Sequence, residues 1–133
     1  MARLGDVRKG IKDRLATISG LEVYATVPAS PQSPSAAVIP RSRELMTMDG
    51  VYRYTFAIWV YVNPSDTVRA QTQIDEYLTE DGSRSIEAAI EADQSLGGIA
   101  QYCIVTGWSE YARFVDIAGG QLLGAEINVE CVA

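Results

Sequence analysis

The chain has 133 residues, 47% of them apolar and 21% charged, with a formal net charge of −6 at pH 7. This composition is typical of a globular protein, argues against a disordered chain, and at this length predicts one domain over residues 1–133. The acidic balance argues against a protein that grips nucleic acid, because such proteins take much of their affinity from cations placed against phosphates.

Residues 3–18 are predicted to form an amphipathic helix, because apolar side chains recur in it at spacings of three and four. These side chains are Leu4, Val7, Ile11, Leu15 and Ile18. Gly20 is placed to end the helix, because glycine adopts the left-handed backbone conformation at little cost. A strand is expected over residues 21–27, and the proline-rich residues 28–35 predict an extended connection on the surface.

Two further strands follow the proline-rich connection. Residues 36–40, AAVIP, predict a short buried strand, which Pro40 places at a sheet edge or brings to an end. Residues 51–62 have the strongest strand pattern, and their even-numbered side chains from Tyr52 to Val62 are apolar and predict the core face. The opposite face, which we expect to be partly covered, carries Arg53, Thr55, Ala57, Trp59 and Tyr61.

The segment 41–50 joins these two strands as an extended loop or a protruding hairpin, with Asp49-Gly50 as a hairpin-type dipeptide. Its Leu45, Met46 and Met48 have no obvious place in the core. Two interpretations stay open. Either these side chains are exposed and form a contact surface, or they fold back over the sheet.

The second half of the chain predicts two helices. The first covers residues 66–79, and the second is shorter and has Ser83 or Ser85 as its cap. The inward side chains are expected to be Val68, Ile74, Tyr77 and Leu78 on the first helix and Ile86, Ala89 and Ile90 on the second. Leu96 is then expected to close the core from a turn that ends in Gly97-Gly98.

Strands complete the chain. One is expected over residues 100–108, residues 110–120 are either a further strand or an irregular arm, and the last strand covers residues 121–132. The side chains of the last strand expected in water are Glu126, Asn128 and Glu130. This order of elements predicts an α+β fold, with a mostly antiparallel sheet of about four to six strands and two or three helices packed on one face.

The two cysteines, Cys103 and Cys131, lie in predicted strands and have no metal-binding spacing. The pattern favours two buried, reduced thiols that act as small core side chains. A disulfide between adjacent strands is the alternative.

The charges are unevenly distributed along the chain. Residues 1–14 contain five basic and two acidic side chains, a net charge of +3, whereas residues 63–93 contain two basic and eight acidic ones, a net charge of −6. Either these are solvated helix faces, or like-charged faces repel something, or faces of opposite charge meet between subunits.

The sequence contains no motif that carries chemistry. It has no histidine, which removes Ser-His-Asp and Cys-His pairs and most zinc or iron sites. Its paired carboxylates fall on helix surfaces in water, where nothing raises their pKa for acid catalysis, and SLGGIA precedes a strand, unlike a phosphate-binding loop. No apolar run reaches membrane-spanning length and the N-terminus is too charged for a secretory signal. We therefore expect a soluble, non-enzymatic protein made in the cytoplasm.

Several segments carry a resemblance to a known family through their order and spacing. GLEVY at 20–24 follows the first helix, PSAAVIP stands at 34–40, and the long aromatic strand comes next. GSRSIEAAIEADQSLGG at 82–98 and LLGAEINVECVA at 122–133 complete the set. In this order the chain resembles the tail terminator, or tail completion, proteins of long-tailed bacteriophages of the siphovirus type.

The resemblance implies a structural function. Members of this family form a homohexameric ring that caps the completed tail tube, ends its polymerisation and presents the surface that joins the head or neck. The implied partners are further copies of the chain, the tail tube protein and a head or neck connector protein. DNA passes through the ring without sequence-specific binding. The resemblance implies no membrane and no cofactor, and it places the protein at the tail–head junction of the virion.

Candidate contact residues follow from the exposure that the sequence pattern predicts. The candidates for docking on the tube or neck are Arg41, Arg43, Leu45, Met46 and Met48. The candidates for subunit contacts are Arg8, Lys12, Arg53, Trp59 and Tyr61. The acidic candidates for the lumen of the ring are Asp75, Glu76, Glu80 and Asp81.

Two other functions remain open. A different head–tail connector, such as a stopper or adaptor, predicts another symmetric assembly with a different docking partner. A small-molecule-binding module or an enzyme predicts a monomer or dimer with a deep polar pocket.

Overall fold

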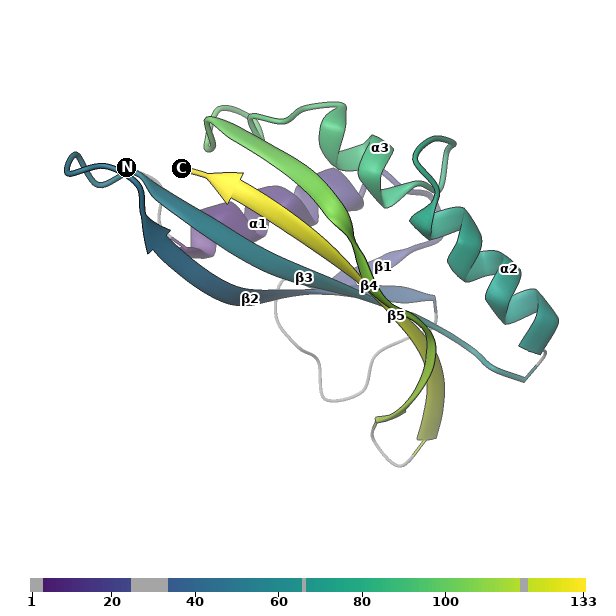
Figure 1. The fold of residues 1–133 in the computed structure, drawn as a ribbon. Coiled ribbons are helices and arrows are strands. Elements are labelled where there is room, and N and C mark those ends of the chain that lie inside the picture. The colour runs from purple at the N-terminus through teal and green to yellow at the C-terminus, as the bar shows by residue number, and fades with distance from the viewer. Residues whose placement is uncertain (1–3, 25–33, 66, 118–119) are drawn as a thin grey trace.

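The computed structural model describes residues 4–24, 34–65, 67–117 and 120–133. Figure 1 shows how its helices and strands follow one another along the chain. In chain order they are α1 (Leu4–Leu15), β1 (Glu22–Tyr24), β2 (Ser35–Leu45), β3 (Tyr52–Val62), α2 (Thr67–Leu78), α3 (Ile86–Glu91), β4 (Tyr102–Ile117) and β5 (Gly120–Val132).

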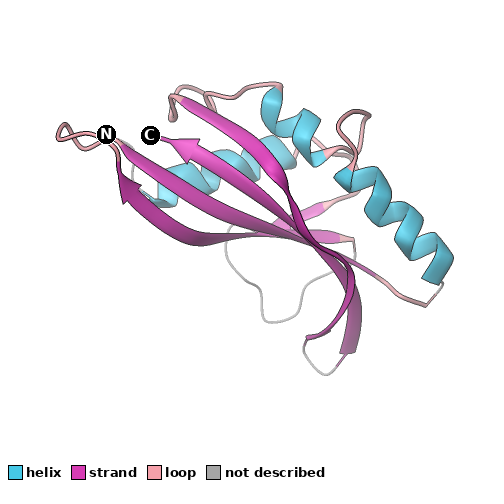
Figure 2. Cartoon of the chain, viewed as in Figure 1, coloured by secondary structure: helices cyan, strands magenta, loops and turns pink. Residues whose placement is uncertain are grey.

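The strands form one five-stranded sheet in the order β1-β2-β3-β5-β4. β1 is parallel to β2, and the other neighbouring pairs are antiparallel. The three helices lie on one side of the sheet, which leaves its other side open (Figure 2). The predicted α+β fold, with its mostly antiparallel sheet and helices on one face, is confirmed.

The core lies between the sheet and the helices. On β3 the even-numbered residues supply the core face, with Phe56, Ile58 and Val60 fully buried, as the alternation predicts. On α1, Val7, Ile11 and Leu15 are buried as the helical spacing predicts, whereas Leu4 at the start of the helix is exposed. The apolar pattern of these two elements therefore determines which side of each faces inward.

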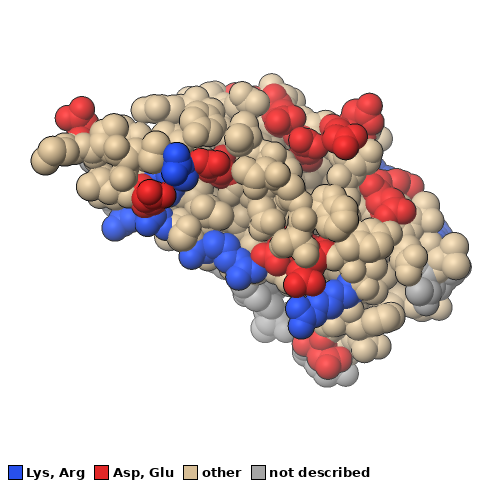
Figure 3. Space-filling model, viewed as in Figure 1, with Lys and Arg blue, Asp and Glu red and all other residues tan. Residues whose placement is uncertain are grey.

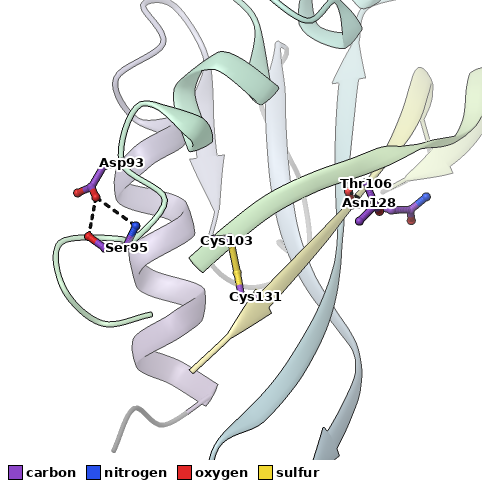
Figure 4. Close-up of a disulfide and its surroundings, with 6 residues drawn as sticks. All are labelled: Asp93, Ser95, Cys103, Thr106, Asn128 and Cys131. Atoms are coloured by element: carbon purple, nitrogen blue, oxygen red, sulfur yellow. Dashed lines mark hydrogen bonds between the residues drawn. A yellow bond between two sulfur atoms is a disulfide. The ribbon is translucent and has the colours of Figure 1, made fainter. Parts of the chain in front are cut away.

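The predicted helix-end signals hold for α3 but not for α1. α1 ends at Leu15, short of the predicted residue 18, so Gly20, with a φ of +81°, lies in the turn between α1 and β1 and does not end the helix. Ser85 caps α3, because its hydroxyl accepts a hydrogen bond from the backbone N–H of Ala88. Leu96 is buried in the turn that follows, and the carboxylate of Asp93 accepts hydrogen bonds that hold this turn (Figure 4).

Two strands are longer than the sequence predicts. β2 continues past Pro40 with a register shift between Pro40 and Ser42. Among the described residues β1 pairs with β2 only at Ser35–Ala37, so no described strand lies beside Pro40 on that side, while Phe56 of β3 lies opposite Pro40 on the other. β2 lies between β1 and β3 and is not an edge strand, so the predicted edge position is wrong, and so is the predicted strand end at residue 40.

β4 continues to Ile117 through three register shifts, so the predicted end at residue 108 is also wrong. Of the two alternatives for 110–120, residues 110–117 are strand. The second half of β4, residues 108–117, and the start of β5, residues 120–124, form a hairpin that bends away from the body of the sheet at the lower right of Figure 1. We call this hairpin the arm.

Val68 does not face inward as predicted, because 77% of its surface is exposed. The buried side chains of α2 are Ala70, Ile74 and Tyr77, spaced by four and three residues. Val68 precedes Ala70 by only two positions and therefore falls on the other side of a helix with 3.6 residues per turn. Residues 25–27 of the predicted first strand and the proline-rich connection up to residue 33 lie outside the described residues.

Cys103 and Cys131 form a disulfide between β4 and β5 (Figure 4). Both residues are fully buried, as expected, but the prediction of two reduced thiols is wrong. The reason is the register, which places Cys103 directly opposite Cys131 on the neighbouring strand. The sequence contains both cysteines but cannot fix this alignment, because 28 positions separate them.

Candidate assembly surfaces

The hairpin between β2 and β3 projects beyond the sheet and carries Met48, the most exposed large apolar side chain among the described residues. Its turn is closed by a hydrogen bond from the N–H of Met46 to the carbonyl of Val51, and Gly50 has a φ of +84°. Leu45 and Met46 are exposed, and the side chain of Met48 is completely exposed. Of the two interpretations of this segment, the structure therefore has the protruding hairpin.

A shallow groove of about 280 Å³ lies at the base of this hairpin, on the helix side of the sheet. It is lined by Leu4, Pro40, Arg41, Ser42, Arg43 and Tyr54. The guanidinium of Arg43 lies 4.4 Å from the ring centre of Tyr52, a cation–π contact. Among the described residues, no carboxylate lies within ion-pair distance of Arg43. The hairpin therefore combines flexible apolar side chains with the positive charge of Arg43, which has no ion-pair partner in the part of the chain that the structure describes.

The open face of the sheet carries ion pairs between neighbouring strands. Arg53 lies 2.6 Å from Glu130 and 3.3 Å from Glu44. Burial acts to lower the pKa of Arg53, but these two carboxylates outweigh it and raise that pKa. Figure 3 shows basic and acidic side chains side by side on this face. Arg53, a predicted subunit contact, is thus bound to carboxylates of its own chain.

Glu126 was predicted to lie on the wet face of β5, and this prediction is wrong, because only 7% of its surface is exposed. Its carboxylate forms an ion pair with Arg41, which comes from the irregular part of β2. Glu126 lies opposite Trp59 on β3, so Arg41 reaches it across the sheet. Arg41 is half-exposed and stays in contact with solvent.

Trp59 and Tyr61 pack within their own chain on the same open face. Their rings are stacked, with centres 6.2 Å apart and an angle of 12° between planes. Gly124 lies under them, and a β-carbon there would come within 3.2 Å of both Trp59 and Val115. Tyr61 is buried, which raises the pKa of its hydroxyl. Its share of any subunit contact would therefore be small.

The basic candidates on α1 are half-buried: Arg8 and Lys12 both lie partly covered, next to the exposed Lys9. Towards the end of the helix, the Nε–H of Arg14 donates a hydrogen bond of 3.0 Å to the carbonyl of Ala89 on α3. This contact ties the basic helix to α3.

The acidic candidates are exposed on α2 and the turn after it. Glu76 pairs with Arg84 at 3.0 Å, and Glu80 and Asp81 are exposed. Acidic side chains gather over α2 and α3 at the upper right of Figure 3. Burial, together with the carboxylates of Glu91 and Glu80, raises the pKa of Glu87. The negative charges of these two helices therefore lie close enough to influence one another.

An aromatic row on the arm was not predicted from the sequence. Trp108 and Phe114 are about half exposed, at 54% and 51%, and Tyr111 lies between them along β4. The rings of Trp108 and Tyr111 have centres 5.7 Å apart, and the Tyr111 hydroxyl donates a 2.6 Å hydrogen bond to Asp75 on α2. This bond raises the pKa of Tyr111 and fixes its ring beside the helix.

The spacing of these aromatic residues explains why the strand pattern did not reveal them. They recur every three positions, whereas a regular strand repeats its faces every two. Register shifts between them place Trp108 opposite Ile127 and Phe114 opposite Leu123, two residues on the helix side of β5. A run of three aromatic side chains within seven residues was the available signal.

Trp108 also borders a hollow of about 210 Å³ between β4 and the helices α2 and α3. The hollow is lined by Tyr77, Leu78, Glu80, Glu87, Val105, Thr106, Gly107, Trp108 and Ile127. Its lining is therefore mostly apolar and aromatic, with the two carboxylates of Glu80 and Glu87. We call it the acidic hollow.

Within the part of the chain that the structure describes, no three His, Cys, Asp or Glu side chains come together as a metal site. No helix among the described residues is long and apolar enough to cross a membrane. Comparison with known protein families found no matching family, and a search of curated proteins found no similar sequence.

Proposed function

We propose that this chain is a tail terminator of a long-tailed bacteriophage. It caps the completed tail tube, ends tube polymerisation and forms the surface that joins the head or neck. In this proposal it is a non-enzymatic virion protein at the tail–head junction, without a cofactor, and its partners are further copies of itself, the tail tube protein and a head or neck connector. The resemblance in segment order supports the proposal.

The observation that carries the proposal is the presence of two unlike exposed apolar surfaces at opposite ends of the sheet. The hairpin exposes Met46 and Met48, and the arm exposes Trp108 and Phe114. A closed ring of identical subunits with head-to-tail contacts needs two different surfaces on each subunit. Large exposed apolar patches on a protein can mark contact surfaces.

The charge distribution is compatible with a ring through which DNA passes. Exposed carboxylates on α2 and the following turn, among them Glu80 and Asp81, would repel a polyanion if they faced the lumen. DNA would then slide past without being retained, as a channel requires. Which residues face the lumen stays a prediction.

Deletion of the gene from the genome that encodes it tests the proposal. We expect tails of irregular, excessive length and heads that remain unjoined in electron micrographs. Tails of normal length joined to heads would contradict the proposed function. Tails of normal length without joined heads would favour a stopper or adaptor instead.

Complementation with variants tests the exposed hairpin. Met46→Ser combined with Met48→Ser should block tail joining while the circular dichroism spectrum and melting temperature stay unchanged, because both side chains are exposed. Val68→Ser is the matched control, since it also removes an exposed apolar side chain, from α2. Normal joining by the methionine variant would remove the hairpin from consideration.

A further inference from the structure

The hairpin and the acidic hollow have opposite chemical character. The hairpin carries Arg43 and the exposed Met46 and Met48, whereas the hollow carries Glu80 and Glu87 beside Trp108. One surface protrudes and the other is recessed. Arg43 is therefore opposite in charge to the hollow, while the other charges of the hairpin are Arg41, paired with Glu126, Glu44, paired with Arg53, and Asp49 in the turn.

The two surfaces cannot meet within one chain, because the hairpin lies at one end of the sheet and α2 and α3 lie towards the other (Figure 1). Each surface also carries charge that its own chain does not balance within the described residues. Among the described residues Arg43 has no carboxylate partner, and in the hollow the like charges of Glu80 and Glu91 add to burial in raising the pKa of Glu87. A cation placed in the hollow would relieve this repulsion.

We propose that the hairpin of one copy of this chain inserts into the acidic hollow of a second copy, with Arg43 against Glu80 and Glu87 and the methionines against Trp108. Methionine sulfur makes favourable contacts with aromatic rings. Tyr111 acts as a positioning residue, because its hydrogen bond to Asp75 holds the ring that packs against Trp108. The contact is head to tail and can repeat from subunit to subunit.

This inference deepens the proposed function and rests on it in one respect, since it names the contact that would close the ring. It also changes the assignment of three residues. Arg43, Met46 and Met48 were docking candidates for the tube or neck, and here they join subunits instead. Arg41 is bound to Glu126 of its own chain and plays no part in the contact.

Charge reversal tests the contact. Arg43→Glu and Glu80→Arg each place like charges together, so each variant alone should self-associate about 30-fold more weakly than the wild type or worse, as for the loss of a central interface residue. Both positions are exposed, so the fold should be retained. Glu22→Arg is the matched control, because it makes the same charge change at an exposed position on β1, outside both surfaces, and should associate like the wild type.

An equimolar mixture of the two reversed variants is the decisive sample. In it, the acidic hairpin of the Arg43→Glu variant meets the basic hollow of the Glu80→Arg variant, and the two unchanged surfaces meet each other. Association should therefore return in the mixture, measured as mass by light scattering or sedimentation over a range of concentrations. Both variants keep a negative net charge, since reversal moves the chain from −6 to −8 or to −4, so general attraction cannot explain the recovery.

Any one of three results would overturn the inference. The wild-type protein could stay monomeric at every concentration, the reversed variants could associate normally, or association could fail to return in the mixture. These results do not depend on the deletion phenotype, which tests the proposed function independently. Abnormal tails on deletion together with a monomeric protein would mean a terminator whose subunits meet in another way.

Discussion

Reduction of the Cys103–Cys131 disulfide should lower the free energy of unfolding substantially while leaving the native fold in place. The bond joins residues separated by 28 positions. In the chain-entropy description, closing a loop of this length removes about 12 cal/mol/K from the unfolded chain, which corresponds to about 3.6 kcal/mol at 25 °C. Both residues are buried between β4 and β5, where many backbone pairs hold the strands together, so we expect the loss to arise mainly in the unfolded state.

Urea unfolding of oxidised and reduced wild-type protein measures this loss. At a slope of about 2 kcal/mol/M, the midpoint should fall by about 2 M on reduction. The double variant Cys103→Ala, Cys131→Ala is the control, because its midpoint should not respond to a reducing agent. Mass spectrometry before unfolding checks that the bond is present in the oxidised sample.

Equal midpoints for the oxidised and reduced wild type would refute this reasoning. If the native protein before reduction also had the mass expected for two free thiols, two hydrogens above that of the disulfide form, Cys103 and Cys131 would be reduced in the native protein.

Two further outcomes are expected from residues in the short turns next to α3. Ser85→Ala should destabilise the protein by about 1–2 kcal/mol in urea unfolding. It removes the hydroxyl that caps α3 by accepting from the N–H of Ala88 and that donates to the carbonyl of Thr79. An unchanged midpoint would contradict this. Asp93→Asn should destabilise at neutral pH, because hydrogen bonds from the Ser95 hydroxyl and nearby backbone N–H groups lower the pKa of this carboxyl. A carboxyl with a lowered folded-state pKa stabilises the fold above its ordinary unfolded pKa of about 3.9 and loses that effect as pH falls through the folded value. The difference in melting temperature between wild type and Asp93→Asn should therefore shrink below about pH 4, and a constant difference would argue against the charged carboxylate as the cause.

The elements that could be predicted from the sequence are those fixed by neighbours within a few residues. Three examples are the apolar spacing of α1, the alternation of side chains along β3 and the cap at Ser85. Each is determined by residues only a few positions apart. The exposed hairpin was one of two interpretations, because sequence alone does not say whether Met46 and Met48 find room on the sheet. The inward placement of Val68 was wrong, although helix geometry alone could have corrected it.

The remaining features depend on how strands from distant parts of the chain align. The disulfide, the Arg41–Glu126 ion pair and the common face of Trp108 and Phe114 all follow from the register of β2, β3, β4 and β5 and from the shifts within it. A shift of one residue turns a side chain to the other face of a sheet, and no local pattern records where such a shift occurs. The sequence by itself determined which elements form and which of their faces are apolar. Only the tertiary structure decided which side chains from different strands meet, because that depends on pairing between segments that lie far apart in the chain.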